Sequence, residues 1–374
     1  MTLNPTPLAA PSLMTPLSRR LGIQAPIAGF SHSIDVTVAV TLSGGLGVFG
    51  ATRNTPDEIA EALAEIRRRV GDRPFGVDLV LPRGMPELDD RQTIEREIPE
   101  EHRAFVREMA QRHQVPTPSG PGMRSRFVRS EEVADQQIEA VLSSGVDLFA
   151  CGIGAPPKAV AAAKARGMTT CALVGSPRHA VEALRTGVDL IVAQGSEAGA
   201  HTGQIGTFTL VPQIVDLCGD VPVMAAGGVA TGQHIVAALA LGAQGVWMGT
   251  AWLTTQEYNA SPTILRKLLA AKSEDAVICR GDSGKPLRQI RSAWSDAWND
   301  HGAPQALKMP YQDILVGDLL GAIDEFDVQA LQHCPAGQGI AYFNETSTVR
   351  QIMAAMLQDA EAVREALAVS RPDV

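Results

Sequence analysis

Eight short apolar segments recur through the first two thirds of the chain, and the stretches between them show helical patterns. Alternation of this kind is typical of β–α–β units, in which parallel strands form one sheet. The nearly continuous apolar character of the segments favours strands that are covered on both faces. Eight such strands close a (β/α)8 barrel, so we predict a TIM barrel of the α/β class. The predicted strands are Gln24–Ala28, Leu46–Gly50, Phe75–Val80, Val146–Ala150, Thr169–Val174, Leu190–Gln194, Val221–Ala225 and Gly245–Gly249.

The regions around these strands suggest three parts. Residues 1–18 carry four prolines and predict an irregular N-terminal arm. Residues 19–260 contain the strands and form the predicted barrel. Beyond it, residues 261–374 look mostly helical and end in an amphipathic segment over Val349–Ala368. This C-terminal region could pack on the barrel or mediate a homodimer, and an amphipathic helix more often packs within its own chain.

An insertion over residues 82–130 separates the third strand from its helix. It is highly charged at first and then rich in proline and glycine. Extra residues after a barrel strand lie on the catalytic face, so the insertion could be a lid. A solvated helical segment with a mobile loop is at least as well supported by its composition.

Composition and charge restrict the function. The formal net charge of −9 and the small number of aromatic residues (4 Trp, 3 Tyr and 9 Phe) argue against a nucleic-acid surface. No apolar run is long enough for a transmembrane helix, and the N-terminus does not resemble a signal peptide. The five cysteines are widely spaced, which is typical of free thiols in a reducing compartment. We therefore expect a cytoplasmic protein.

Two glycine-containing turns are the strongest local signals. The segment from Pro222 to Gln233 runs from an apolar strand through Gly227 and Gly228 into a helix, and a second turn lies at Gly245–Thr250. Glycines at such turns let backbone N–H groups approach an anion, and phosphate sites in TIM barrels often lie after the last two strands. Tight packing of a strand against its helix would also explain a single turn, but two turns in these positions favour phosphate binding.

A small-residue loop after the sixth strand carries His201. A histidine on such a loop can act as a general base or hydrogen-bond donor, or it can merely hold a turn. Glu197 in the same loop is expected to cap loop amides. The remaining histidines show no spacing that suggests a metal, and no Rossmann fingerprint, Walker P-loop or G-x-S-x-G elbow occurs.

Taken together, these pieces resemble the nitronate monooxygenase family of FMN-dependent (β/α)8 barrels. The resemblance extends from about Leu17 to the C-terminus and is interrupted by the insertion. The matching segments are Ala25–Gly29, Ser43–Gly47, Pro74–Leu79, Ala193–His201, Ala225–Gly228, Met248–Thr250, Gly284–Arg288 and Ala336–Gln338.

The resemblance implies that FMN lies across the carboxyl end of the barrel. Its phosphate would be held by Gly228 and by the backbone of Trp247, Met248, Gly249 and Thr250. Further flavin contacts are implied for Ala28, Gly29, Asp78, Gln194 and Gly199. His201 matches the family's catalytic histidine, which would act as a base or bind the anionic nitronate. The implied partners are a small-molecule substrate and O2, and the use of NAD(P)H is left open.

Two residues depart from the family pattern. Asp78 stands where an asparagine amide usually contacts the flavin, and a carboxylate cannot donate a hydrogen bond unless it is protonated. Phe30 follows Ala28 and Gly29 where a methionine is common. Alternative functions are an FMN-dependent enoyl thioester reductase, an NAD(P)H:quinone reductase or, more distantly, a phosphosugar-binding barrel without flavin. The insertion could form a larger acyl pocket in the reductase case.

Overall fold

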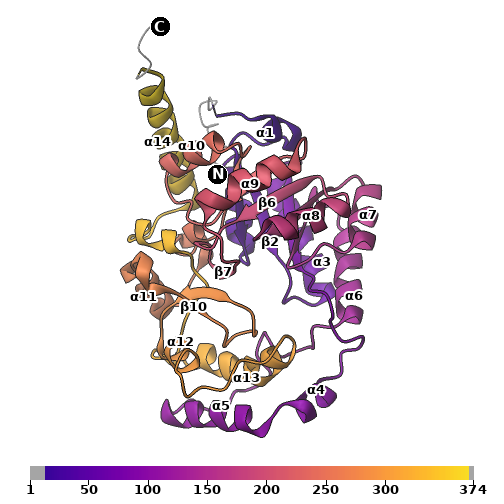
Figure 1. Cartoon of the computed structure of the whole chain (residues 1–374), viewed down its shortest axis with the longest axis vertical. Helices are drawn as coiled ribbons and strands as arrows, with labels where there is room; N and C mark the ends of the chain where they lie inside the picture. Colours follow the sequence, from indigo (N-terminus) through magenta and orange to yellow (C-terminus); the bar gives the residue numbers. More distant parts are fainter. Residues whose placement is uncertain (1–12, 370–374) are drawn as a thin grey trace.

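The computed structural model describes residues 13–369 and contains a closed parallel barrel (Figure 1). Its eight strands pair in the order β1-β2-β3-β4-β5-β6-β8-β9, so the predicted TIM barrel is confirmed. The strands are β1 (Ile27–Ser31), β2 (Leu46–Gly50), β3 (Phe75–Val80), β4 (Leu148–Gly152), β5 (Thr169–Val174), β6 (Leu190–Gln194), β8 (Val223–Ala226) and β9 (Val246–Met248).

The first strand begins three residues later than predicted. Pro26 has no N–H to donate, so the ladder starts at Ile27, which pairs with Val246. The backbone N–H groups of Gln24 and Ala25 instead bind the carbonyl of Gly44. This shift carries Phe30 and Ser31 to the carboxyl end of the barrel.

Helices cover the outside of the barrel. Those that alternate with the strands are α2 (Ile34–Leu42), α3 (Pro56–Val70), α6 (Glu131–Leu142), α7 (Pro157–Ala165), α8 (Pro177–Arg185), α9 (Thr207–Cys218) and α10 (Gly232–Ala240). In α3, the Thr55 hydroxyl accepts from the N–H of Glu58, and the Glu58 carboxylate accepts from the N–H of Thr55. Such a capping box fixes where the helix begins.

Side chains alternate between the barrel interior and the helical layer. Leu46 and Val48 point inward and meet Leu148 and Val192, whereas Phe49 points outward against the helices. The interior is therefore filled by apolar side chains, and a bound molecule can reach it only at the ends.

A helix lies near each end of the described chain. The expected irregular arm, residues 1–18, is wrong in its last part because α1 (Pro16–Leu21) forms there and buries Leu17 under the barrel interior. Residues 1–12 lie outside the described part. At the other end, α14 (Val349–Val369) packs on α10 and α2. A Cβ atom on Gly232 would lie 2.1 Å from the backbone nitrogen of Ala360, so the close approach of α10 and α14 requires glycine.

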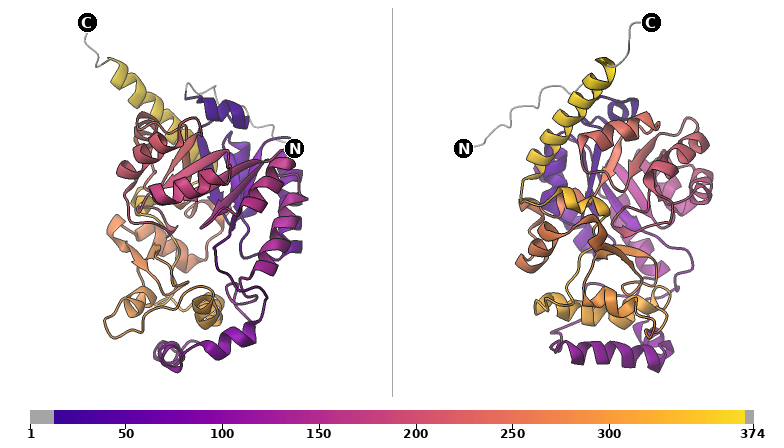
Figure 2. Two further views of the ribbon diagram at one scale, coloured as in Figure 1. Left: turned by 45° about the vertical axis from the view of Figure 1, so that its right-hand side comes forward. Right: turned by 60° about the vertical axis from the view of Figure 1, so that its left-hand side comes forward.

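The insertion and part of the C-terminal region together form a second layer below the carboxyl end of the barrel (Figures 1 and 2). We call this layer the cap and define it as residues 82–130 and 276–334. Its helices are α4 (Arg91–Glu97), α5 (Glu100–Arg112), α12 (Ala293–Trp298) and α13 (Tyr311–Glu325). The cap has its own apolar cluster around Trp294 and Trp298, and α13 contacts both α4 and α5.

A small antiparallel sheet joins the cap to the barrel. It consists of β10 (Ala276–Cys279), β11 (Leu287–Ile290) and β7 (Ala200–His201). These strands were not predicted, because each is at most four residues long and is defined by pairing between distant segments. The remaining elements are α11 (Pro262–Ala270) and the 3-10 turns η1 (Thr250–Trp252), η2 (Gln256–Tyr258), η3 (Ser273–Asp275) and η4 (Gln338–Tyr342).

Among residues 13–369, no helix is both long and apolar enough to span a bilayer.

Candidate active site

A cavity of about 470 Å³ opens at the carboxyl end of the barrel, on the side that faces the cap. This volume is in the range of small-molecule and cofactor sites. Nine of the residues singled out in the sequence line it: Asp78, Gln194, Gly199, His201, Gly228, Trp247, Met248, Gly249 and Thr250. They come from four barrel strands and the segments that follow them.

Ala28 and Gly29 are placed differently. Ala28 points into the barrel interior below the cavity, and Gly29 faces the helical layer, where a Cβ atom would meet Val40 at 2.6 Å. The later start of β1 brings Phe30 to the cavity wall instead, with its ring stacked near that of Trp247 at 6.3 Å between centroids.

The two glycine turns form one wall of the cavity. Gly227 and Gly228 have positive φ angles of 93° and 74°, which favour glycine. The N–H groups of Gly228, Val229 and Gly249 bind no acceptor in the described part of the chain, and all three residues line the cavity. Free amides that converge beside a helix N-terminus are suited to a phosphate group.

The segment around Gly337 holds these turns from the cap side. Its N–H donates to the hydroxyl of Thr250 at 2.9 Å, and Gly199 packs so closely against Ala336 that a Cβ atom would lie 2.8 Å from its carbonyl carbon. Gln194 donates from its side chain to the carbonyl of His201 at 2.7 Å, which fixes the loop between them. The carboxylate of Glu197 accepts from the N–H and hydroxyl of Thr207, so the predicted capping role of Glu197 is confirmed.

His201 is held between the barrel and the cap. It lies on β7, which pairs with Leu287 of β11, and its Nε2 atom shares a hydrogen bond of 2.7 Å with the hydroxyl of Ser283. Burial lowers the pKa of His201 to about 3, and the positive charges of nearby arginines act in the same direction. The imidazole is therefore neutral near pH 7 and can accept a proton or donate a hydrogen bond.

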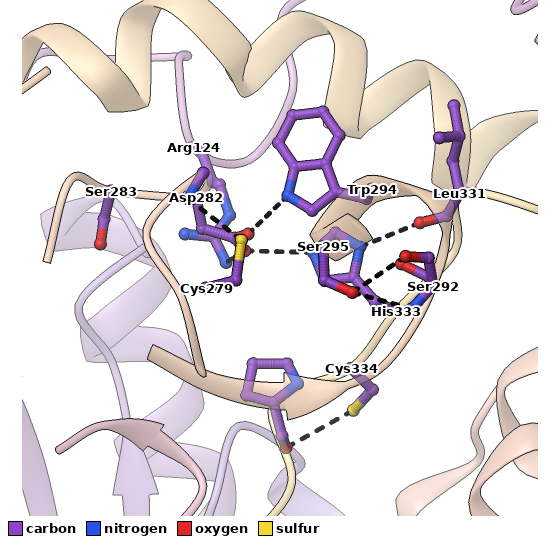
Figure 3. Close-up of polar contacts among 12 residues, drawn as sticks. Arg124, Cys279, Asp282, Ser283, Ser292, Trp294, Ser295, Leu331, His333 and Cys334 are labelled. Atoms are coloured by element: carbon purple, nitrogen blue, oxygen red, sulfur yellow. Dashed lines mark hydrogen bonds and ion pairs between the residues drawn. The ribbon is translucent and has the colours of Figure 1, made fainter. Parts of the chain in front are cut away.

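A buried carboxylate organises the loop that carries Ser283 (Figure 3). Asp282 accepts from the indole N–H of Trp294 at 2.9 Å and lies 2.9 Å from the guanidinium of Arg124 and 3.2 Å from the imidazole of His333. Burial opposes its negative charge, but His333 and Arg124 outweigh this effect and hold the pKa of Asp282 well below its usual range. The loop is thereby tied to α12 and to the insertion.

Three arginines gather beside His201. Arg53, Arg124 and Arg129 line one small cavity together with Asp313, and the charge of each lowers the pKa of His201. Arg124 is paired with Asp282, whereas the guanidinium groups of Arg53 and Arg129 form no ion pair with any residue in 13–369. Asp313 lies 3.9 Å from Arg124 and offsets part of the charge, and burial lowers the pKa of Arg53 and Arg129. With three arginines against Asp282 and Asp313, the cluster keeps a net positive charge near the imidazole.

Asp78 lies on β3 and lines the cavity. Its neighbours Val77 and Leu79 point outward into the helical layer, so the alternation of β3 directs the Asp78 side chain into the barrel mouth. It is 4% exposed, and its Oδ1 atom has no hydrogen-bond partner among the described residues. Burial raises the pKa of Asp78 to about 7.

Comparison with known proteins identifies the family of this chain. The family model for nitronate monooxygenase matches residues 12–359. The chain belongs to the nitronate monooxygenase family. A provisionally named nitronate monooxygenase of Bacillus subtilis is 31% identical over 90% of this chain and 95% of its own length. Rv1533 of Mycobacterium tuberculosis, provisionally named a monooxygenase, is 40% identical over 82% of this chain and 84% of its own length.

Solved structures agree with this family membership. Nitroalkane oxidase from Streptomyces ansochromogenes has a TM-score of 0.76 and 26% identity, with 92% of this chain and 98% of that chain covered. FabK from Thermotoga maritima has a TM-score of 0.74 and 26% identity, with 96% and 99% covered. This nitronate monooxygenase family member is accordingly an oxidoreductase with a TIM-barrel fold.

Several residues of the candidate site in this member of the nitronate monooxygenase family were not predicted from the sequence. They are Ser283, Asp282 and the arginines Arg53, Arg124 and Arg129. Ser283 directly precedes the matched segment Gly284–Arg288, which is the one signal that could have drawn attention to it. The arginines come from the end of β2 and from the insertion, and only folding places them together.

Proposed function

We propose that this enzyme binds FMN across the carboxyl end of the barrel and oxidises small alkyl nitronates with O2. The observation that carries the proposal is that a neutral histidine, His201, lines the cavity beside a group of arginines that carries a net positive charge. A nitronate is an anion, and a cavity with this electrostatic character favours an anion over a neutral substrate.

The residues present fit FMN. Free amides of Gly228, Val229 and Gly249 offer donors for its phosphate, and the cavity extends from these turns across the barrel mouth to Asp78. When bound, FMN would supply the redox chemistry by taking electrons from the substrate and passing them to O2.

The protein's own groups would bind and orient the substrate. The hydrogen bond with Ser283 leaves the imidazole plane of His201 fixed at the cavity wall. A neutral imidazole can take a proton from a nitroalkane carbon or donate a hydrogen bond to the oxygen of a nitronate. The positive charge of Arg53 and Arg129 would stabilise the negative charge on the substrate in both cases.

A second function is supported by the likeness to FabK. This would be an FMN-dependent reductase that uses NAD(P)H to reduce an enoyl thioester or a quinone. The phosphates of NAD(P)H are also anions, so the arginines alone do not decide between the two reactions.

Anaerobic flavin spectra separate the proposals. The purified protein is incubated with FMN and then mixed with propyl-2-nitronate or with NADPH. Bleaching of the flavin band by the nitronate, strongly slowed in His201→Ala, is the expected result. Bleaching by NADPH alone would instead favour the reductase function. A protein that binds no flavin at all would overturn both and favour a phosphosugar-binding barrel.

His301→Ala is the matched control, because His301 is an exposed residue of the cap. It should behave as the unmodified protein in both reactions.

A further inference from the structure

The carboxyl group of Asp78 is a buried polar group of the cavity that its described surroundings do not account for. It is buried, it points into the barrel mouth, and its Oδ1 atom lacks any partner in the described chain. No lysine or arginine of residues 13–369 forms an ion pair with it. A buried carboxylate without a cation or a donor is strongly unfavourable, whereas the protonated acid is tolerated.

The groups that face Asp78 carry no charge that would change this. The titratable groups near it are the thiols of Cys151 on β4 and Cys171 on β5, and the imidazole of His32, whose Nδ1 atom shares a hydrogen bond with the carbonyl of Gly50, the β2 residue that pairs with Asp78. Burial raises the pKa of both thiols and lowers the pKa of His32, so all three groups are uncharged near neutral pH. Gly152, also on β4, presents only backbone, and a Cβ atom there would lie 3.7 Å from both carboxyl oxygens.

The strand order places Asp78 across the mouth from the glycine turns. β3 and β8 are four strands apart in a closed barrel of eight, so they face each other. A cofactor whose phosphate lies on the turns after β8 and β9 would therefore extend its other end toward β3. We propose that Asp78 is held in its protonated form and donates a hydrogen bond to the ring end of the bound flavin.

This inference rests on the proposed function, since it requires a flavin in the cavity. It adds a consequence of its own, which is that flavin binding should weaken as the pH rises. Protonated Asp78 offers a donor to the flavin, whereas ionised Asp78 offers only negative charge, which opposes both an anionic reduced flavin and an anionic substrate. Binding that requires the protonated form weakens by about tenfold for each pH unit above the pKa.

The first test measures FMN affinity against pH by fluorescence quenching on the full chain. The unmodified protein should lose affinity above about pH 7 by up to roughly tenfold per pH unit, because its donor is lost. Asp78→Asn, whose amide always donates, should bind FMN with little change over the same range. Asp189→Asn is the matched control, since Asp189 precedes β6 at the opposite end of the barrel, and it should follow the unmodified protein. Equal pH profiles for Asp78→Asn and the unmodified protein would overturn the inference.

The second test is infrared spectroscopy without flavin, and it compares the unmodified protein with Asp78→Asn because burial also raises the pKa of Asp324. Infrared spectra of the protein labelled with 13C at aspartate should show the carbonyl stretch of a protonated carboxyl at about pH 6 and its loss at about pH 8. Absence of this band at pH 6, together with FMN binding that does not depend on pH, overturns the inference and leaves the proposed function standing. Failure to bind FMN at every pH overturns the proposed function, and with it the donor role toward the flavin, whether or not the band is present.

Discussion

The Nε2 atom of His201 lies 2.7 Å from the hydroxyl of Ser283, and this contact joins a barrel loop to the cap. The two residues come from segments more than eighty positions apart, and neither the loop nor the cap alone could orient the imidazole. The position of the candidate base is thus set by the interface between the two layers.

Removal of the Ser283 hydroxyl should weaken catalysis without abolishing it. Ser283→Ala is expected to lower kcat/KM for a nitronate by about tenfold, which corresponds to the loss of one hydrogen bond. His201→Ala removes a donor to the anionic nitronate and should cost about 10- to 100-fold, the range for a hydrogen bond to a charged group. If Ser283 acts only through His201, the double variant Ser283→Ala/His201→Ala should lose about as much kcat/KM as His201→Ala alone. Additive losses in steady-state kinetics would show that the two residues act separately.

Neutralisation of the unpaired arginines should weaken the binding of anionic substrates. Arg53→Gln or Arg129→Gln is expected to raise KM for a nitronate by about tenfold and to reduce its dependence on salt. Removal of the Arg129 charge should also raise the pKa of His201, because repulsion by that cation lowers it. Kinetics over a salt series and an NMR titration of His201 measure these effects. Arg68→Gln on the exposed face of α3 is the control, and a similar effect there would contradict a local role for the cluster.

The buried Asp78 should make stability depend on pH. Its pKa is higher in the folded protein than in the unfolded chain, so the folded state holds the extra proton and loses stability as the pH rises toward and through about 7. Relative to Asp78→Asn, the unmodified protein should lose roughly 3 kcal/mol of unfolding free energy between about pH 5 and pH 8. Urea unfolding of both proteins without flavin measures the difference, and parallel pH curves would contradict it.

Asp282 should stabilise the cap at neutral pH. Asp282→Ala leaves Arg124 and His333 without their buried partner, which is expected to cost about 3–5 kcal/mol. Because the pKa of Asp282 is depressed in the folded protein, its contribution is present at neutral pH and is lost as the pH falls below about 4. Thermal unfolding of this variant should be compared with Asp296→Ala, which breaks only an exposed ion pair with Arg291. An equal effect of the two changes would contradict the prediction.

The sequence was most informative where apolar segments were continuous. The predicted bounds of β2, β3, β5 and β6 agree with the structure, because these strands are buried on both faces and flanked by clear turns. The predicted start of β1 was three residues too early, because Pro26 interrupts the apolar run and has no N–H to donate to the ladder. The family resemblance implied flavin contacts for Ala28 and Gly29, whereas Phe30 is the residue of β1 whose side chain reaches the cavity wall.

The candidate site was partly predictable for a related reason. Residues that follow barrel strands, such as Gly228 and His201, can be placed from strand order alone. Ser283 and the arginines Arg53 and Arg129 cannot, because they meet only through packing among the loop after β2, the insertion and the C-terminal region. The pairing of β11 with β7 is likewise a tertiary contact that leaves no periodic pattern in the sequence.

The division of the cap into residues 82–130 and 276–334 has a consequence for biosynthesis. A growing chain contains all eight barrel strands once Met248 has been added, and domains generally begin to fold in this N-to-C order. At that moment the insertion has no α13 to pack against, and His201 has no Ser283. A ribosome must therefore translate the chain through Ser283 and α13 before the nascent enzyme can form the contact that orients His201.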